Sequence, residues 1–192
     1  MENYTCFKDL PPGMARVGRL QSIFGEQVTL IQVAWGEKRP IQKEFQKLDV
    51  EVMRDPEHLR MLEGSNIGIL AGRSSGNLIS IDFDEDEAEK EFCAANSELV
   101  ETVTSKGSRG ANYWYRISGD YLDKIVKLKR NGAEVGEWRG GGGHTVVDGL
   151  HPSGVPYYIS SAHPVKVIEF SDICWPENWE IGALAEGEGE LV

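Results

Sequence analysis

The sequence predicts an α+β fold, in which short strands in meander order combine with a few helices. Hydrophobic residues make up 40% of the 192 residues and charged residues 27%, which is typical of a chain that can bury a core. Short runs rich in β-branched and aromatic residues alternate with turns, and the 22 glycines supply many such turns. Helical segments are few and do not alternate regularly with strands, as a doubly wound sheet would require.

The first third of the chain is expected to contain one strand and two helices. Residues 27–35 are rich in β-branched residues and predict a strand. Residues 42–48 and 56–63 have helical composition. The second of these helices carries a start signal, because Asp55 suits the N-cap and Pro56 suits the first helical position.

The centre of the chain gives the clearest pattern. Residues 66–72 and 78–84 are mainly apolar runs that predict two strands, with a tight loop at 73–77 between them. This five-residue connection predicts that the two strands pair as a hairpin. Residues 86–96 then predict a helix whose first turn is acidic, which suits the helix dipole.

The second half is expected to consist mainly of strands and turns. Glycine clusters mark several of the turns, and the longest cluster runs from Gly140 to Gly143. Strands are predicted at 102–105, 112–117, 134–139, 144–147 and 156–159, with a basic glycine loop at 106–110, a polar loop at 118–132 and a glycine turn at 140–143.

Composition also argues against a membrane-bound or secreted protein. No run approaches the ~20 apolar residues that span a bilayer, and no secretory leader is visible at the N-terminus. The three cysteines lie far apart without metal-binding spacing, which fits a reducing compartment. We therefore expect a cytoplasmic protein with no membrane partner.

The charge is negative overall but unevenly distributed. A formal net charge of −11 argues against a broad basic face for nucleic acid. Residues 82–91 hold seven acids and one lysine, whereas residues 106–139 hold eight Lys or Arg and four Asp or Glu. A site for metal and phosphate needs such neighbouring regions, although a solvated helix face also explains the acidic run.

Asp82 and Asp84 are the first candidates for chemistry. Side chains alternate along a strand, so both carboxylates lie on one face, about 6.6 Å apart along it. Like charges this close repel unless a cation or protons neutralise them. Oxygen ligands without Cys or His favour Mg²⁺ or Mn²⁺ over Zn²⁺. The alternative is that both acids face solvent at the end of a strand.

Other charged residues are candidates that also have structural explanations. Glu137 and Arg139 share a strand face, so they form either part of a site or a structural ion pair. Lys106 and Arg109 lie in the glycine loop, which suits either a phosphate-binding nest or an ordinary turn. His144 follows the glycine run and is either a donor to phosphate or sugar or a structural residue.

Several common catalytic arrangements are missing from the sequence. His151 opens the sequence His-Pro-Ser-Gly and has the same two explanations as the histidine before it. No Walker A motif occurs, so the glycine loop is not a P-loop. No G-x-S-x-G elbow or Ser/His/Asp order occurs, which disfavours an acyl-transfer hydrolase.

The combination of motifs resembles that of a known family. The first motif of the archaeo-eukaryotic primase superfamily is similar to residues 66–84, N-I-G-I-L-A-G-R-S-S-G-N-L-I-S-I-D-F-D. The closest branch is the bifunctional primase/polymerase (prim-pol) domain of plasmids, phages and other mobile elements. Its third motif and the segment after it resemble residues 135–157, V-G-E-W-R-G-G-G-G-H-T-V-V-D-G-L-H-P-S-G-V-P-Y. The usual upstream lysine and proline resemble G-E-K-R-P at 36–40, and the whole resemblance spans roughly residues 30–160.

This resemblance implies an RRM-like catalytic sheet packed with a smaller N-terminal α/β unit. It also implies that Asp82, Asp84 and Glu137 hold Mg²⁺ or Mn²⁺ and catalyse nucleotidyl transfer to a primer 3′-hydroxyl. In the family's second motif a histidine contacts the incoming triphosphate, and the neutral Asn112 stands at that position here. The residues expected to bind the nucleotide are Lys106, Arg109, Asn112, Arg139 and His144.

We therefore expect one prim-pol-like domain at residues 1–182 and a flexible acidic tail or linker at 183–192. Within the domain, the N-terminal part is expected at about 1–65 and the catalytic core at about 66–170. The expected function is metal-dependent nucleotidyl transfer in the replication of a mobile element. Its expected partners are nucleoside triphosphates, a DNA template or primer, and a helicase domain or partner. The alternatives are a weakly active or inactive nucleotide- or nucleic-acid-binding module, a metal-dependent nuclease that uses the same acids, and a structural protein.

Overall fold

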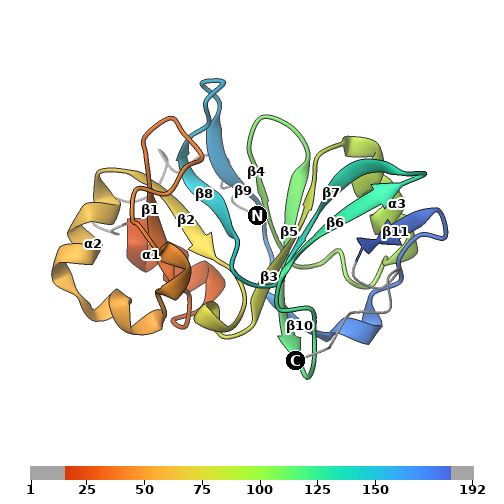
Figure 1. Cartoon of the computed structure of the whole chain (residues 1–192), viewed down its shortest axis with the longest axis horizontal. Coiled ribbons are helices and arrows are strands. Elements are labelled where there is room, and N and C mark those ends of the chain that lie inside the picture. The colour runs from red at the N-terminus through yellow and green to blue at the C-terminus, as the bar shows by residue number, and fades with distance from the viewer. Residues whose placement is uncertain (1–15, 183–192) are drawn as a thin grey trace.

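The computed structural model describes residues 16–182, in which strand pairing builds a mixed α+β fold around a large sheet (Figure 1). The α-helices of this range are α1 (Arg16–Phe24), α2 (Pro56–Glu63) and α3 (Asp86–Ala95). The strands of the same range are β1 (Leu30–Val33), β2 (Asn66–Leu70), β3 (Leu78–Phe83), β4 (Val103–Lys106), β5 (Ala111–Ser118), β6 (Ile125–Arg130), β7 (Ala133–Arg139), β8 (His144–Leu150), β9 (Pro156–Ala162), β10 (Lys166–Glu169) and β11 (Trp179–Ile181).

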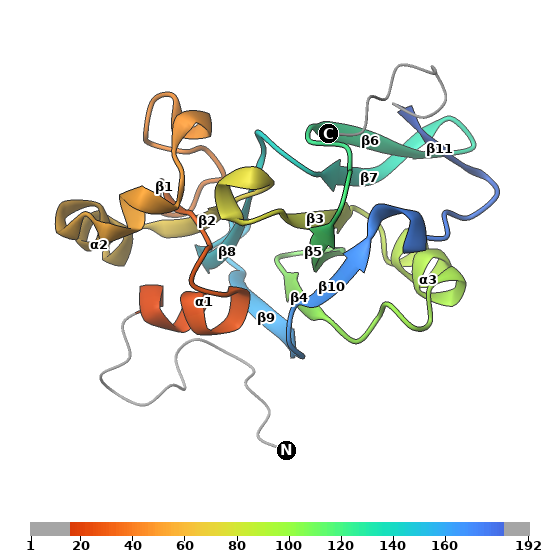
Figure 2. The same ribbon diagram turned by 90° about the horizontal axis from the view of Figure 1, so that it is seen from below.

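The strand order divides the fold into two lobes (Figures 1 and 2). Across the sheet the order is β1-β2-β8-β9-β4-β5-β3-β7-β6-β11, and neighbours along this path are antiparallel. β10 pairs with β5 in parallel. We call β1, β2 and β8 with α1 and α2 the first lobe, and β3 to β7, β10 and β11 with α3 the second lobe. β9 connects them, because it pairs with β8 at one end and with β4 along its length.

One face of the second lobe's sheet is apolar and packs against α3. Side chains alternate along a strand, so Ile79, Ile81 and Phe83 of β3 point to this face and are buried. Phe83 packs against Phe92 of α3, with ring centroids 5.1 Å apart. The residues between these apolar positions of β3 therefore point to the opposite face.

The opposite face of this sheet is apolar at one end and polar at the other. Trp114 of β5 is completely buried against Phe24 of α1, with ring centroids 5.0 Å apart. Its indole N–H donates to Ser105 Oγ at 2.9 Å. Trp114 is thus a core residue that packs the first lobe against the second, and the polar end of the face remains for other contacts.

Most of the expected elements are confirmed, and so is the α+β class. α2 begins at Pro56, and the Asp55 carboxylate accepts a hydrogen bond from the Glu57 N–H at 2.9 Å, as an N-cap residue does. The acidic helix is α3, which covers most of the expected range. Strands occur within or close to every expected run.

The expected hairpin between 66–72 and 78–84 is reduced to a single antiparallel bridge, in which the Gly72 N–H donates to the Leu78 carbonyl at 2.7 Å, so the predicted pairing of the two strands is wrong. β2 pairs with β1 and β8, whereas β3 pairs with β5 and β7. The chain leaves the first lobe at Gly72, whose φ of +89° is accessible mainly to glycine. A Cβ at Gly72 would lie 2.3 Å from the Gly140 carbonyl oxygen, so two crossing segments approach closely here. The expected meander order is wrong for the same reason, because β3 lies in the middle of the second lobe's sheet.

Two further segments differ from expectation. Residues 42–48 form a short 3₁₀ turn at Phe45–Lys47, because Glu44 has a left-handed φ of +54° that interrupts a helix. The segment 118–132 contains β6, in which buried Val126 and Leu128 alternate with exposed lysines. That alternation is a strand signal which the polar composition of the segment conceals. α1 was not expected either.

The sheet crosses the expected boundary near residue 65. This boundary falls between β1 and β2, which pair with each other. The tail expected at 183–192 lies outside the described residues. Among residues 16–182 no helix is both long and apolar enough to cross a membrane.

We predict that Gly110→Ala is strongly destabilising. Gly110 enters β5 with a φ of +62°, and a Cβ there would lie 1.7 Å from the Phe83 carbonyl oxygen. Because that oxygen belongs to the sheet backbone, the free energy of unfolding should fall by more than about 3 kcal/mol.

The matched control is Gly132→Ala, measured with Gly110→Ala by urea denaturation. Gly132 has a φ of +79°, but nothing lies within 4 Å of the added Cβ. Its loss should therefore be only the conformational cost of about 1–2 kcal/mol. Equal losses in the two variants would contradict the backbone clash.

Candidate functional site

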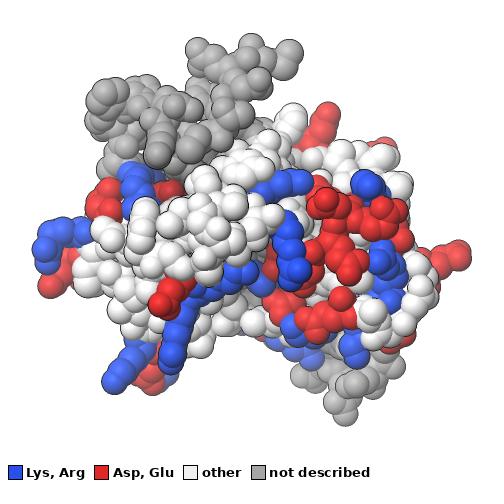
Figure 3. Space-filling view, turned by 90° about the horizontal axis from the view of Figure 1, so that it is seen from above, with Lys and Arg blue, Asp and Glu red and all other residues white. Residues whose placement is uncertain are grey.

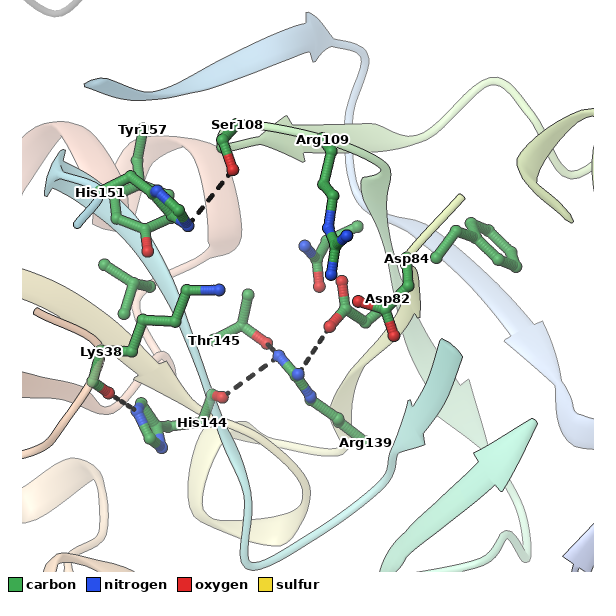
Figure 4. Close-up of a pocket in the computed structure, with 14 residues that line it drawn as sticks. Lys38, Asp82, Asp84, Ser108, Arg109, Arg139, His144, Thr145, His151 and Tyr157 are labelled. Atoms are coloured by element: carbon green, nitrogen blue, oxygen red, sulfur yellow. Dashed lines mark hydrogen bonds and ion pairs between the residues drawn. The ribbon is translucent and has the colours of Figure 1, made fainter. Parts of the chain in front are cut away.

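A pocket of ≈ 500 Å³ lies where the two lobes meet (Figure 4). Its walls come from the turn after β1, the ends of β3 and β7, the β4–β5 loop, β8 and the β8–β9 hairpin. Both lobes therefore contribute to it. The residues that line it are Lys38, Asp82, Phe83, Asp84, Gly107, Ser108, Arg109, Asn112, Arg139, His144, Thr145, Val146, His151 and Tyr157.

Strand register explains how distant polar residues come together beside this pocket. Asp82 of β3 is directly opposite Glu137 of β7 on one side and Asn112 of β5 on the other. Lys127 lies opposite Glu137, and Ser105 lies opposite Asn112. Directly opposed residues of antiparallel strands point to the same face. The result is one polar row across the face that does not pack against α3.

Arg139 connects this polar row to the first lobe. Its Nη2 lies 2.6 Å from Asp82 Oδ2, and its Nε donates to Glu137 Oε2 at 2.8 Å. Its Nη1 donates to Thr145 Oγ1 of β8 at 2.8 Å, and this hydroxyl lies 3.1 Å from Ser80 Oγ. One guanidinium thus bridges β7, β3 and β8, as Figure 4 shows for Asp82 and Thr145.

The two acids that contact Arg139 have different electrostatic surroundings. Burial raises the pKa of Asp82, and the Arg139 charge opposes this rise. The neighbouring carboxylates of Asp84 and Glu137 raise the pKa of Asp82 further. Burial also acts to raise the pKa of Glu137, but hydrogen bonds from Lys127 and Arg139 bring it below its ordinary value. Glu137 is therefore a firmly ionised partner, whereas a further cation near Asp82 would stabilise its charged form.

The pocket also contains two cations that form no ion pair with any residue of 16–182. Figure 4 shows Arg109 reaching from the β4–β5 loop toward Asp82 and Asp84. Lys38 points into the pocket from the turn after β1. Because neither cation has an ion-pair partner within the described residues, both are available to an anionic ligand.

His151 is a neutral hydrogen-bond donor at the edge of the pocket. Its Nδ1 accepts a hydrogen bond from the Ser153 N–H at 3.0 Å, so the ring proton is on Nε2. Nε2 lies 3.3 Å from Ser108 Oγ. Burial lowers the pKa of His151, and the charges of Lys38 and Arg109 lower it further. His151 therefore cannot accept the Ser108 proton in this tautomer, which argues against a Ser-His nucleophile.

Two buried polar atoms of the pocket lack a hydrogen-bond partner among residues 16–182. They are Asn112 Oδ1, which is an acceptor, and the Tyr157 hydroxyl, which is a donor. Burial raises the pKa of Tyr157 to about 12, so the hydroxyl keeps its proton. Buried polar groups are nearly always paired, so these two atoms indicate a place for a polar ligand.

His144 lines the pocket but uses its polar atom for structure. Its Nε2–H donates to the Lys38 carbonyl at 2.9 Å, and its ring packs edge-on against Phe45. Burial lowers the pKa of His144, while the hydrogen bond to Lys38 acts in the other direction. The neutral ring therefore fixes the turn that carries Lys38.

The structure brings most of the expected site residues together. Six of the eight line the pocket, namely Asp82, Asp84, Arg109, Asn112, Arg139 and His144. Glu137 lies beside them through its contact with Arg139. Lys106 does not reach the pocket: its Nζ lies 3.2 Å from Glu89 Oε2 of α3, on the other face of the sheet. Alternation along β4 explains this, since its neighbour Ser105 belongs to the polar row.

Some residues of the site were not expected from the sequence. Lys38 lies in the G-E-K-R-P segment and His151 in His-Pro-Ser-Gly, so a signal existed for each, although neither was assigned to the site. Nothing in the sequence distinguished Thr145 or Tyr157 from other strand residues. Their role depends on the pairing of β8 with β2 and with β9.

The acids fit a metal only in part. Among residues 16–182 no group of three or more His, Cys, Asp and Glu has the arrangement of a metal site. Both oxygens of Glu137 already accept hydrogen bonds, from Lys127 and Arg139. Mg²⁺, however, is commonly held by one or two carboxylates together with substrate phosphates and water. Asp82 and Asp84 fit that arrangement.

Comparison with protein-family models and with curated protein sequences found no match to this chain. The pocket is therefore interpreted from its own residues.

We predict that Arg139→Met destabilises the protein through the acids that it leaves behind. The side chains of Asp82 and Glu137 are each 18% exposed, so a lost partner is not fully replaced by water. The free energy of unfolding should fall by about 2–3 kcal/mol near neutral pH.

The control for this prediction is the double variant Arg139→Met/Asp82→Asn. Removing the unpaired charge should restore about 1 kcal/mol or more relative to the single variant, measured by denaturant unfolding. Simple addition of two destabilising effects would show that Asp82 does not depend on Arg139.

We also predict a pH dependence from His144. Its pKa in the folded state lies below 6.5, so the unfolded state binds more protons as the pH falls. This group therefore lowers stability from about pH 6.5 downward to its folded pKa, and contributes no such loss at higher pH. His144→Gln, which retains an N–H donor, should flatten the decline. An NMR titration that places the pKa of His144 at or above 6.5 would contradict this account.

Proposed function

We propose that this chain is a primase-polymerase-like domain that binds a nucleoside triphosphate with Mg²⁺ or Mn²⁺ and catalyses nucleotidyl transfer. One observation carries the proposal: a single pocket contains two aspartates, Asp82 and Asp84, and two cations, Lys38 and Arg109. The two cations form no ion pair within the described residues. A triphosphate with its bound metal has the complementary charges, because the metal suits the carboxylates and the phosphates suit Lys38 and Arg109.

The pocket has two groups of residues with different proposed roles, one for the metal and one for the phosphates. Asp82 and Asp84 would hold the divalent cation, which when bound stabilises the attacking and leaving oxygens of the transfer. Lys38 and Arg109 would bind and orient the phosphates, and the neutral His151 would add a hydrogen bond. Arg139 holds Asp82 from the protein side. The positions of these side chains in Figure 4 support the proposed roles.

Glu137 has a conditional role in this proposal. As the structure stands, it positions Arg139 beside Asp82, and its second oxygen accepts from Lys127 at 2.5 Å. It would become a third metal ligand only if Lys127 and Arg139 released it. The metal is therefore expected to bind together with the nucleotide rather than before it.

The topology supports the finer fold that the proposal needs. β3, α3, β4 and β5 follow in β-α-β-β order, and β3 lies between β5 and β7 in the sheet. This arrangement is typical of ferredoxin-like and RRM-like sheets. A difference is that β6 lies between β5 and β7 in the chain, where such folds have a second helix. The first lobe would be the smaller accompanying unit.

The resemblance of the sequence motifs supports the biological setting of the proposal. Prim-pol domains of plasmids, phages and other mobile elements act in replication, and a DNA template or primer and a helicase would be partners of such an activity. A cytoplasmic location is part of the same proposal.

A second candidate function is a nucleotide-binding module without transfer activity. Asn112 favours it, because this residue brings no positive charge to the position where the related motif has a histidine. Its buried Oδ1 is an acceptor, which suits a sugar hydroxyl better than a phosphate. Primer synthesis distinguishes the two functions, whereas nucleotide binding is common to both.

We predict that Arg109→Gln weakens binding of adenosine triphosphate in Mn²⁺ by about tenfold or more, as loss of a charge-assisted contact to phosphate would. Asp84→Asn should remove the dependence of binding on Mn²⁺. Isothermal titration calorimetry measures both effects, and a primer-synthesis assay follows for the wild type.

Lys106→Gln is the matched control, because Lys106 belongs to the same loop region but contacts Glu89 on the other face. Its affinity for the nucleotide should stay within about twofold of the wild type. Equal weakening by Lys106→Gln and Arg109→Gln, or the lack of Mn²⁺-dependent binding in the wild type, would refute the proposed site.

A further inference from the structure

Some exposed apolar side chains belong to segments that line the pocket but have no role in the proposed nucleotide site. Among residues 16–182 the large exposed hydrophobic residues are Trp35, Ile41, Ile125, Val155 and Val167. Trp35 and Ile41 belong to the segment after β1, and Val155 belongs to the β8–β9 hairpin. Both segments also supply pocket residues, namely Lys38 and His151.

The turn that carries Trp35 is ordered by its own hydrogen bonds. The Ala34 N–H donates to the Arg39 carbonyl at 3.2 Å, and the Glu37 N–H donates to the Ala34 carbonyl at 3.0 Å. Val33 and Pro40 form a bridge at the base of this turn. The Trp35 side chain is nevertheless 60% exposed. A fixed turn thus presents a large aromatic surface to solvent.

Asn66 holds this turn against the end of β8. Its Nδ2 donates to the Glu37 carbonyl at 3.0 Å and to the Leu150 carbonyl at 2.8 Å. Its Oδ1 accepts from the Leu150 N–H at 2.8 Å. Figure 1 shows the turn after β1, the β8–β9 hairpin and the β4–β5 loop rising on the same side of the molecule. The turn that carries Trp35 therefore borders the pocket, into which Lys38 of the same turn points.

The charge of this edge is opposite to that of the chain as a whole. Residues 35–43 contain Lys38, Arg39 and Lys43 against one acid, Glu37, whereas the whole chain has a net charge of −11. None of these three basic side chains forms an ion pair within the described part of the chain, and all three are exposed. Figure 3 shows the acidic side chains gathered over the half that contains α3, β6 and β7.

We infer that this edge binds a single-stranded nucleic acid, with a base stacked on Trp35 and a phosphate on Arg39, while Lys38 serves the pocket. We call Trp35, Arg39 and Val155 the entry rim. An exposed aromatic ring on a basic segment is a common means of binding single strands, because every base has a face that can stack. A paired base in a duplex does not offer that face. The inference rests on the proposed function, for which it names the site of the template strand.

The test uses fluorescence anisotropy of a labelled oligothymidylate with the full chain and no nucleotide. Trp35→Ala should weaken binding by about 5- to 150-fold, while Trp35→Phe, which keeps an aromatic face, should stay within about threefold. Val167→Ala is the surface control, because Val167 is 62% exposed on β10 and lies outside the rim. Arg39→Gln should reduce the slope of log affinity against log salt by about 0.7.

Two results would overturn the rim: equal affinity of wild type and Trp35→Ala for the single strand, or tighter binding of a duplex of the same length. Nucleotide binding by calorimetry is measured in parallel, and Trp35→Ala should leave it unchanged. If the nucleotide fails to bind while the Trp35 effect remains, the proposed function fails and the rim stands. If the nucleotide binds and the oligonucleotide does not, the rim fails and the proposed function stands.

Discussion

The Arg139 guanidinium neutralises two carboxylates that the strand register brings together. Pairing of β3 with β7 puts Asp82 directly opposite Glu137, and two carboxylates in partly buried positions cannot both remain ionised without a compensating charge. Arg139 supplies that charge and also donates to Thr145 on the other lobe. The same side chain therefore stabilises the acids and fixes the two lobes together, so the shape of the pocket depends on it. Lys127 completes the arrangement by occupying the outer oxygen of Glu137.

Local patterns in the sequence were sufficient where burial and side-chain period determine the structure. The fully buried run of β2, the capped start of α2 and the alternation of β3 could all be predicted because each depends on neighbours in the chain. β6 shows how a true signal can be missed, since its lysines alternate with buried Val126 and Leu128 yet make the segment look like a loop. The connection at 73–77 was misinterpreted because loop length indicates a hairpin only if the two strands share a partner edge. Here Gly72 directs the chain away from the strand that precedes it.

The candidate site was predictable in its acids and less so in its cations. The sequence predicted strands that contain Asp82, Glu137 and Asn112. The strand register then brings these three residues together. Lys106 and Arg109 looked equivalent in sequence, but Lys106 still belongs to β4 and follows its alternation to Glu89, whereas Arg109 lies in the loop and turns into the pocket. Lys38 and His151 come from loops whose proximity depends on β2 lying between β1 and β8, and on the three hydrogen bonds of Asn66. Such a contact depends on long-range pairing that no local pattern encodes.

The position of β8 and β9 in the strand order also governs the route by which the chain folds. β2 and β4 each have one partner nearby in the chain, β1 and β5, but the partner of their other edge lies between residues 144 and 162. Until that segment emerges, both strands keep a row of unpaired backbone N–H and C=O groups, which is the kind of edge that templates aggregation. Pairing between strands so far apart in the chain is slow, because the entropy of closing the intervening loop is lost before the stabilising contacts form. Synthesis of the β8–β9 hairpin therefore completes the pairing of β2 and β4, and until then these two edges are the part of the sheet most exposed to pairing with another chain.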